Sequence, residues 1–504
     1  MTGTTARMST RVMSRSMRSV LQGRCGGALL VLGAVCLLPL ACGEHTTTVP
    51  LPGESPEEIL QEALGSLGTL VPVKLDTAAL ASAVQAGQSI RLPFAEEGGQ
   101  LVQRDVHLIL RNLRAPDLVE FVLKDGVQQQ GHTQPLPPPA TYQGIVAAQG
   151  GGQPGAAVLT ITAQVVAGNL LVAPDGWSII EPLEPMLRLR GVEPARRQRV
   201  LGKYNHVVYN SRDTRLPQPS SSGAALAASP ADSHATAVGQ PPTPLVLSIV
   251  GDGDAELFQA YPLDSVMPFW LMQETLFNAI DWLYNCVEPD ANPDNAYTVC
   301  DNHFDGGAGA FQARLRIDRL ETWTAGGPTA NSAGELMVES ARFTHQSTPV
   351  CCGEPHTAGQ SSLVHFFTGK AFPGSAGNAS VGGLNVYGDG CEQPLASFCC
   401  HHGVSQIVPG NGTPGTLFQV QLLMAHEIGH NTGGEEDRFG YAQDWLFGEK
   451  SGPTLMYSGF DGFPAEEVFV YASDVAANKI GPLLAQRLGE APDVTTSCDS
   501  APVM

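Results

Sequence analysis

Two histidines and a glutamate near residue 430 have the spacing of a metal-dependent hydrolytic site. His426 and His430 lie four residues apart in the segment His-Glu-Ile-Gly-His, near the end of a helix predicted over residues 417–431. Four residues is about one helical turn, so both imidazoles project from one face and can bind a single zinc ion. Glu427 lies beside them, placed to take a proton from a zinc-bound water and return it to a leaving amine.

The residues that follow the motif carry a family resemblance. The segment HEIGHNTGGEED closely resembles the reprolysin (adamalysin/ADAM) branch of the metzincins, whose motif runs H-E-L-G-H-N-L-G-x-x-H-D. The resemblance implies that Gly433 ends the active-site helix and that Met456, in Thr-Leu-Met-Tyr, lies in the Met-turn beneath the metal. Only glycine enters the left-handed conformation cheaply, which suits such a turn.

The third metal ligand is where this sequence departs from the family. The family has a histidine at the position of Glu436, and Asp437 follows it. A carboxylate oxygen is an acceptable zinc ligand, so Glu436 is the expected third ligand and Asp437 the alternative. Two other interpretations stay open: a solvated acidic turn beside a weak two-histidine site, and a thermolysin-like site that takes Glu466 or Glu467 from a later helix.

The elements that would position this site predict a mixed α/β (α+β) domain over residues 245–500. Buried-type or alternating apolar patterns predict strands near residues 245–250, 311–317, 363–368 and 380–387. A helix after Asp264-Ser265 places Phe269, Met272, Leu276, Ile280 and Leu283 on one face. A last helical region is expected near residues 475–488. The resemblance implies a metzincin-like catalytic domain with a mixed twisted sheet and an active-site helix.

A β-rich domain over residues 55–210 is expected to precede the catalytic domain. Ser55 caps a short helix through Leu64, and strand patterns follow. Four segments resemble landmarks of the reprolysin propeptide in the right order: 107–113, 142–146, 180–183 and 206–209. Reprolysin propeptides often hold latency with a cysteine thiolate, yet no cysteine lies between Cys42 and Cys286. Residues 216–244, rich in Pro, Ser and Ala, predict a flexible linker.

The first 41 residues have the pattern of a secretory signal peptide. Five arginines and no acidic residue precede a short apolar stretch. Leu-Pro-Leu-Ala-Cys then resembles a lipobox in which Cys42 would be lipidated, with plain secretion as the alternative. We therefore expect an exported protein, either a cell-envelope lipoprotein or a secreted one, that contacts a membrane only through its signal or lipid anchor. Eight cysteines remain after Cys42, consistent with up to four disulfides.

Overall charge excludes some partners. The 504 residues carry 28 Lys and Arg against 49 Asp and Glu, a formal net charge of −21, so the basic surface of a nucleic-acid binder is not expected.

Two other segments, one basic and one with paired histidines, each allow two interpretations. Arg196-Arg197-Gln198-Arg199 resembles a dibasic processing site but favours a solvated turn, and His401-His402 favours a surface loop over a metal site.

These patterns predict an exported zinc endopeptidase that hydrolyses peptide bonds in protein or peptide substrates with one catalytic Zn²⁺. The alternative is a catalytically weak or inactive surface lipoprotein that uses a metzincin fold as a binding or adhesion module. The substrate specificity and the oligomeric state do not follow from the sequence.

Overall fold

The structure is a computed structural model of the 504-residue chain. It describes residues 53–214, 245–285, 313–339, 360–379, 402–433, 441–453 and 484, with gaps at 117, 119, 125–126, 135, 149–153, 173–174, 338, 373–376, 408–414 and 445–449. The chain divides into two units, Met1–Gly53 and Glu54–Met504, and every element below belongs to the second. The expected signal peptide, Cys42, the linker and all eight later cysteines lie outside the described residues.

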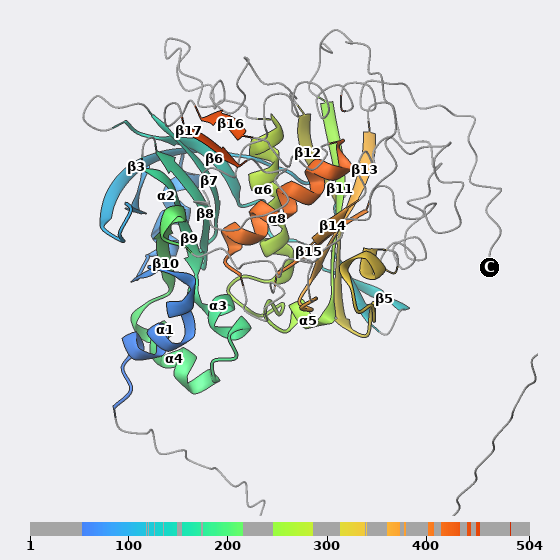
Figure 1. Cartoon of the computed structure of the whole chain (residues 1–504), viewed down its shortest axis with the longest axis horizontal. Coiled ribbons are helices and arrows are strands. Elements are labelled where there is room, and N and C mark those ends of the chain that lie inside the picture. Colours follow the sequence, from blue (N-terminus) through green and yellow to red (C-terminus); the bar gives the residue numbers. More distant parts are fainter. Residues whose placement is uncertain are drawn as a thin grey trace, which may run out of the picture. The chain divides into compact units, whose positions relative to one another are not determined.

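The described elements fall into a β-rich first half, up to residue 214, and an α/β second half from residue 245 (Figure 1). The helices are α1 (Pro56–Leu64), η1 (Gly65–Leu67), α2 (Thr77–Gln85), α3 (Leu183–Leu189), α4 (Pro194–Lys203), η2 (Ser211–Asp213), α5 (Ala255–Phe258), α6 (Phe269–Asn285) and α8 (Leu417–Asn431). The strands of the first half are β1 (Val71–Val73), β2 (Ile90–Ala95), β3 (Leu101–Leu110), β4 (Glu120–Lys124), β5 (Val127–Gln134), β6 (Thr141–Val146), β7 (Gly155–Ile161), β8 (Val166–Val172), β9 (Gly176–Pro182) and β10 (His206–Asn210). Those of the second half are β11 (Leu245–Gly253), β12 (Ala313–Ala325), β13 (Gln360–Thr368), β14 (Gly377–Ala379), β15 (His402–Gln406), β16 (Tyr441–Asp444) and β17 (Lys450–Pro453).

Eight strands form a first sheet that is antiparallel throughout. Its order is β1-β10-β9-β8-β7-β6-β3-β2, so most neighbours along the chain are also neighbours in space. The sheet curls: the backbone N–H of Ala95 donates to Ser178 Oγ at 2.8 Å, and Asn210 Nδ2 donates to the Ala95 carbonyl at 3.0 Å. One face packs on α2 around a separate apolar cluster that contains Leu92, Phe94 and Leu159.

Seven strands form a second sheet in the order β14-β15-β13-β11-β12-β4-β5. Strands β15, β13, β11, β12 and β4 run parallel to their neighbours, and the outer strands β14 and β5 run antiparallel. The expected mixed α/β architecture is confirmed. A two-stranded antiparallel sheet, β16 with β17, completes the described strands.

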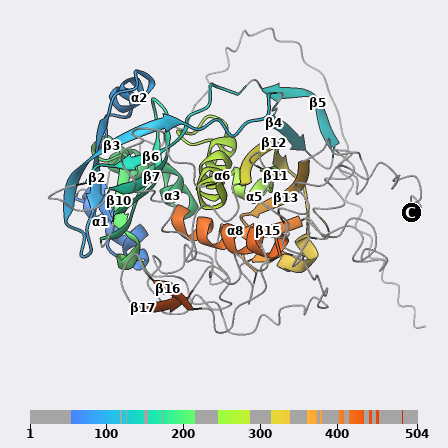
Figure 2. The ribbon, with the colours of Figure 1, turned by 90° about the horizontal axis from the view of Figure 1, so that it is seen from above.

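The β4–β5 hairpin is a segment of the first half that belongs to the second sheet. The chain leaves the first sheet after β3, forms the hairpin beside β12, and returns to the first sheet as β6, which pairs with β3. The pairing of β4 with β12 joins residues about 200 positions apart, such as Glu120 with Leu320. Figure 2 shows β4 and β5 next to β12, separated from the other strands of the first half.

Helices α6 and α8 lie between the two sheets (Figure 2). One large apolar cluster contains side chains of both helices together with residues of the first and second sheets, including Trp177, Leu247 and Leu315. The five apolar residues predicted on one face of α6 are all buried, but so are its polar residues Gln273, Glu274, Asn278 and Asp281. The helix is therefore covered on both sides, and its polar face meets the first sheet instead of solvent.

Several local predictions agree with the observed elements. The helix over 417–431 has the predicted bounds. Ser55 caps α1: its hydroxyl accepts from the Glu58 N–H, and the Glu58 carboxylate accepts from the Ser55 N–H. The strand predicted at 363–368 forms the second part of β13. The predicted strand at 380–387 lies outside the described residues, as does the helical region at 475–488 except for Leu484. Among the described helices, none is long and apolar enough to cross a membrane.

Candidate metal centre

Helix α8 carries the histidine motif, and its first turn is firmly capped. Thr416 accepts a hydrogen bond from the Gln419 N–H, and the Gln419 side chain accepts one from the Thr416 N–H at 2.9 Å. This reciprocal pair satisfies two of the backbone donors that every helix start leaves open. All fifteen residues of α8 are buried, so the helix is fixed along its whole length.

The two histidines converge as the spacing predicts. The Nε2 atoms of His426 and His430 lie 3.0 Å apart, with the imidazole rings nearly perpendicular, and both side chains are buried. Zinc binds histidine nitrogen at about 2.0–2.1 Å, so two ligands of one ion come within a few ångströms of each other. The donor chemistry and the shared direction of the two rings therefore fit a zinc ion.

Glu427 lies against the outer strand β14. A Cβ atom built on Gly377 would lie 2.3 Å from Glu427 Oε1 and 2.8 Å from the Val404 carbonyl oxygen. Such distances are far inside van der Waals contact, so only a residue without a side chain allows the strand and the carboxylate to approach this closely. Glu427 as a whole is 4% exposed, which places it in a largely water-excluded environment.

The end of α8 agrees with the predicted glycine turn. The helix ends at Asn431, Thr432 is its C-cap, and Gly433 has a φ of +100°. Tyr284 of α6 and Thr432 share a hydrogen bond of 2.8 Å, and Asn431 donates to the His402 carbonyl at 3.1 Å. These contacts fix the end of the helix just beyond His430.

The remaining expected site residues are not among those the structure describes. Glu436 and Asp437, the two candidates for the third ligand, lie outside the described residues. The same holds for Met456 and for Glu466 and Glu467 of the thermolysin-like alternative. Within the described residues, no group of three or more His, Cys, Asp or Glu side chains is placed to bind one metal ion.

Two further histidines are buried next to the site. His365 in β13 lies 2.9 Å from Ser405 Oγ through its Nε2, and burial lowers its pKa to about 3, as a structural histidine requires. His402 begins β15 and is fully buried, so its assignment to a surface loop is wrong. The strand places it beneath the end of α8, a position that no local sequence pattern indicates.

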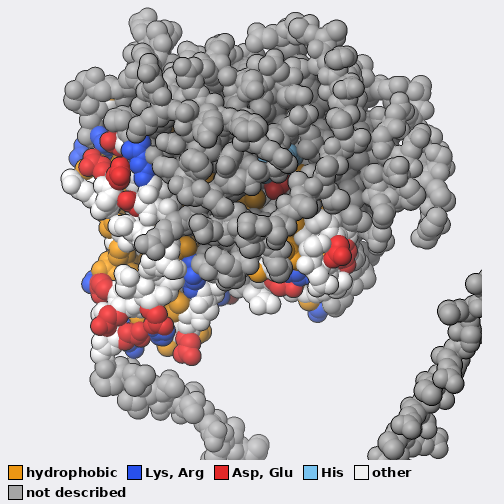
Figure 3. Space-filling view, in the orientation of Figure 1, with side chains coloured by type: hydrophobic (Ala, Val, Ile, Leu, Met, Phe, Trp, Pro, Cys, Tyr) orange, Lys and Arg blue, Asp and Glu red, His pale blue; other side chains and the backbone are white. Residues whose placement is uncertain are grey.

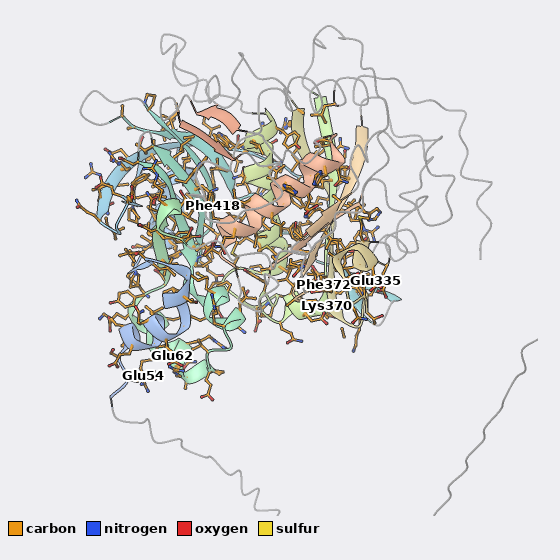
Figure 4. The ribbon with its side chains drawn as sticks, viewed as in Figure 1. Glu54, Glu62, Glu335, Lys370, Phe372 and Phe418 are labelled. Carbon is orange, nitrogen blue, oxygen red and sulfur yellow. The ribbon has the colours of Figure 1, made fainter. Side chains whose placement is uncertain are left out.

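Two residues of the first sheet contact the start of α8, and no sequence pattern indicated them. Glu181 of β9 accepts a hydrogen bond from the Leu417 N–H, and Asn169 Nδ2 of β8 donates to Gln421 Oε1 at 2.7 Å. Burial raises the pKa of Glu181 to about 8, although hydrogen bonds from the Leu417 and Phe418 backbone act in the opposite direction. Phe418, labelled in Figure 4, lies at the end of α8 nearest the first sheet.

The comparisons with known proteins agree with the motif. Residues 299–436 match the family model described as "Metallo-peptidase family M12B Reprolysin-like". This segment is about a quarter of the chain and includes β12 to β15, α8 and the position of Glu436.

Other comparisons are less informative. No curated protein matches the chain. One solved structure, described as "Structure of a chaperone-substrate complex", matches at 12% sequence identity with a TM-score of 0.26, over 48% of this chain and 35% of that one. A likeness this distant carries no argument about the fold or the function. The matched segment contains helix α8 with its converging histidines, so this part of the chain is similar to the reprolysin-like metallopeptidases of family M12B.

Proposed function

We propose that the protein is an exported zinc-dependent endopeptidase. The observation that carries the proposal is the convergence of His426 and His430 on one face of a buried helix, with Glu427 beside them and the family match across the same segment. Metallopeptidases of this family depend on zinc and act on proteins or peptides.

The roles of the residues follow from their chemistry. His426, His430 and, by our proposal, Glu436 would bind one zinc ion, with Asp437 as the alternative third ligand. Such an ion supplies a Lewis acid for the scissile carbonyl and for the attacking water. Glu427 takes the proton from that water as general base and delivers it to the leaving amine as general acid.

Strand β14 is suited to align a substrate. It ends the second sheet among the described residues, and its Gly377 lies against Glu427. An extended peptide can add to the outer strand of a sheet through main-chain hydrogen bonds. We propose that the substrate backbone runs along β14, which would bring its scissile bond next to the general base.

Hydrolysis of a generic protein substrate by the purified full chain tests this function. Glu427→Ala should reduce the rate by about 100-fold or more, because the proton acceptor is lost, and should leave bound zinc unchanged. Glu335→Ala, at an exposed glutamate that belongs to neither α8 nor the strands beside it (Figure 4), is the control and should have no effect. Activity that survives Glu427→Ala or complete metal chelation would contradict the mechanism.

A second candidate function follows from Glu436, which stands where the family has a histidine. A carboxylate adds negative charge and weakens the metal as a Lewis acid, so the fold could serve as a surface binding module with little or no catalysis. Metal analysis of the purified protein separates the candidates, since zinc well below one equivalent favours the module. Glu436→His should tighten zinc binding if Glu436 is a ligand; unchanged affinity points to Asp437 or to a two-histidine site.

A further inference from the structure

The first half of the chain and the second half, from residue 245 on, contribute side chains to one apolar cluster. We propose that residues 54–214, called the N-terminal region below, are a permanent structural half of the peptidase: they complete its catalytic sheet, clamp α6, hold the start of the active-site helix, and stay bound after the chain is cut between the halves. The proposal goes beyond the proposed activity and does not depend on it.

The first contact is strand completion. Strand β12 pairs with β11 on one side and with β4 on the other, over Leu320 to Ala325. Upstream of β4, the Ala115 N–H donates to the Ile317 carbonyl at 2.9 Å, and the Ile317 N–H donates to the Leu113 carbonyl at 2.7 Å. The N-terminal region thus covers the edge of β12 at two places along its length. Removal of this cover would leave unpaired backbone groups on a long strand.

The second contact consists of two buried ion pairs between α6 and the segment that leads from β3 into the β4–β5 hairpin. Arg111 binds both carboxylate oxygens of Asp281, at 2.6 and 3.0 Å, and Arg114 binds both oxygens of Glu274, at 2.5 and 3.0 Å. The two acidic side chains are at most 2% exposed. Charges this deeply buried are tolerated only when they are paired. Without the N-terminal region, Asp281 and Glu274 would each lose the arginine that pairs with it.

The third contact matches the polar face of α6 to the first sheet. Asn278 Nδ2 donates to the carbonyls of Tyr142 and Leu159 at 3.1 and 3.2 Å, and Thr275 donates to Thr160 at 2.9 Å. Asp281 also accepts from Gln143 Nε2 at 2.9 Å and from the backbone N–H of Leu315 in β12 at 2.8 Å. A single α6 carboxylate therefore connects both sheets.

The fourth contact is with the active-site helix itself. Besides the bonds from Glu181 and Asn169 to the first turns of α8, Trp177 of β9 packs edge-on against Trp282 of α6, with ring centroids 5.2 Å apart. Trp177 also lies 6.4 Å from the Phe418 ring of α8. The side chains that position His426 and His430 through α8 therefore include several from the N-terminal region.

The dibasic segment does not offer a release site. It lies within helix α4, so its interpretation as a solvated turn is wrong. Arg196 pairs with Glu54 and Glu62, and Arg199 donates to the Glu54 carbonyl at 3.0 Å. Figure 3 shows acidic and basic side chains intermixed on the surface over α1 and α4. Proteases prefer exposed loop tips, so a paired helix resists cleavage.

A controlled cut between the halves tests the proposal. A recognition site for a specific protease is inserted into residues 216–244 of the full chain, and the cut protein is run on size exclusion, without denaturant and in urea. We expect the two fragments to elute together without denaturant, with the metal content of the uncut chain, and to separate only in urea. The chain without the inserted site, incubated with the same protease, is the control.

Separation of the fragments without denaturant would overturn the proposal. So would a C-terminal fragment that, once separated from the N-terminal region, stays soluble and retains its metal. Neither readout requires proteolytic activity, so loss of the proposed function and loss of the association are distinguishable.

Discussion

At the residue scale, the candidate site depends on close approach as much as on its ligands. Gly377 brings β14 into contact with Glu427, and no side chain could occupy its position without moving the carboxylate or the strand. A displacement of about 1 Å in a catalytic group can cost on the order of 100-fold in rate. Position 377 therefore tolerates as little change as Glu427, the general base in our proposal.

Gly377→Ala should lower kcat by roughly 100-fold and leave zinc content unchanged, because the atoms nearest to the added methyl are those of the Glu427 carboxylate and the Val404 carbonyl oxygen. Steady-state kinetics with metal analysis checks this. The control is Gly202→Ala in α4, where an added Cβ meets nothing within 4 Å. Equal activity of Gly377→Ala and the unmodified protein would show that the carboxylate does not need this space.

At the scale of elements, helix α8 connects the two halves of the molecule. Its C-terminal turns carry His426 and His430, and the Leu417 N–H in its first turn donates to the Glu181 carboxyl group of β9. The raised pKa of Glu181 makes this contact sensitive to pH. A carboxyl group whose pKa is higher in the folded than in the unfolded protein stabilises fully below its ordinary pKa, near 4.5, and loses that contribution as pH rises towards 8.

Glu181→Gln should flatten this pH dependence. The amide keeps an oxygen acceptor for the Leu417 N–H but does not titrate, so the variant avoids the loss of up to about 1.4 kcal/mol per pH unit that the carboxyl incurs between pH 5 and 8. The measurement is urea unfolding of both proteins across this range. Parallel curves for the two proteins would indicate that Glu181 has the same pKa folded and unfolded.

At the scale of the whole molecule, the two halves share one apolar cluster and a set of buried ion pairs. Burial raises the pKa of Glu274, while the Arg114 guanidinium acts to lower it. Removing one partner of a buried pair leaves the other uncompensated, which costs far more than breaking an exposed pair.

Arg114→Ala should destabilise the full chain by about 3–5 kcal/mol, since it leaves the Glu274 carboxylate buried without its partner. Arg91→Ala removes the exposed pair with Asp105 on the first sheet and should cost far less, because solvent screens that pair. Denaturant unfolding of the two variants compares the costs. If both lose the same small amount, the Arg114–Glu274 pair does not join the halves energetically.

Local patterns determined much of the site. The spacing of His426 and His430 fixes their common face on any helix, and the helix over 417–431 forms with the predicted bounds. The positive φ of Gly433 and the cap at Ser55 follow in the same way from the chemistry of single residues. The third ligand and the Met-turn stay predictions, because they lie outside the described residues.

What only the tertiary structure decided is how distant segments meet. The sequence indicates a strand near the position of β4, and nothing in its pattern says that it pairs with β12 about 200 residues later. Nor does it place Glu181 at the start of α8, Gly377 against Glu427, or the polar face of α6 against a sheet. Helical and strand periodicity report local burial, whereas strand partners are chosen by the packing of the complete chain. The sequence therefore determined the chemistry of the site, and the packing determined which residues surround and position it.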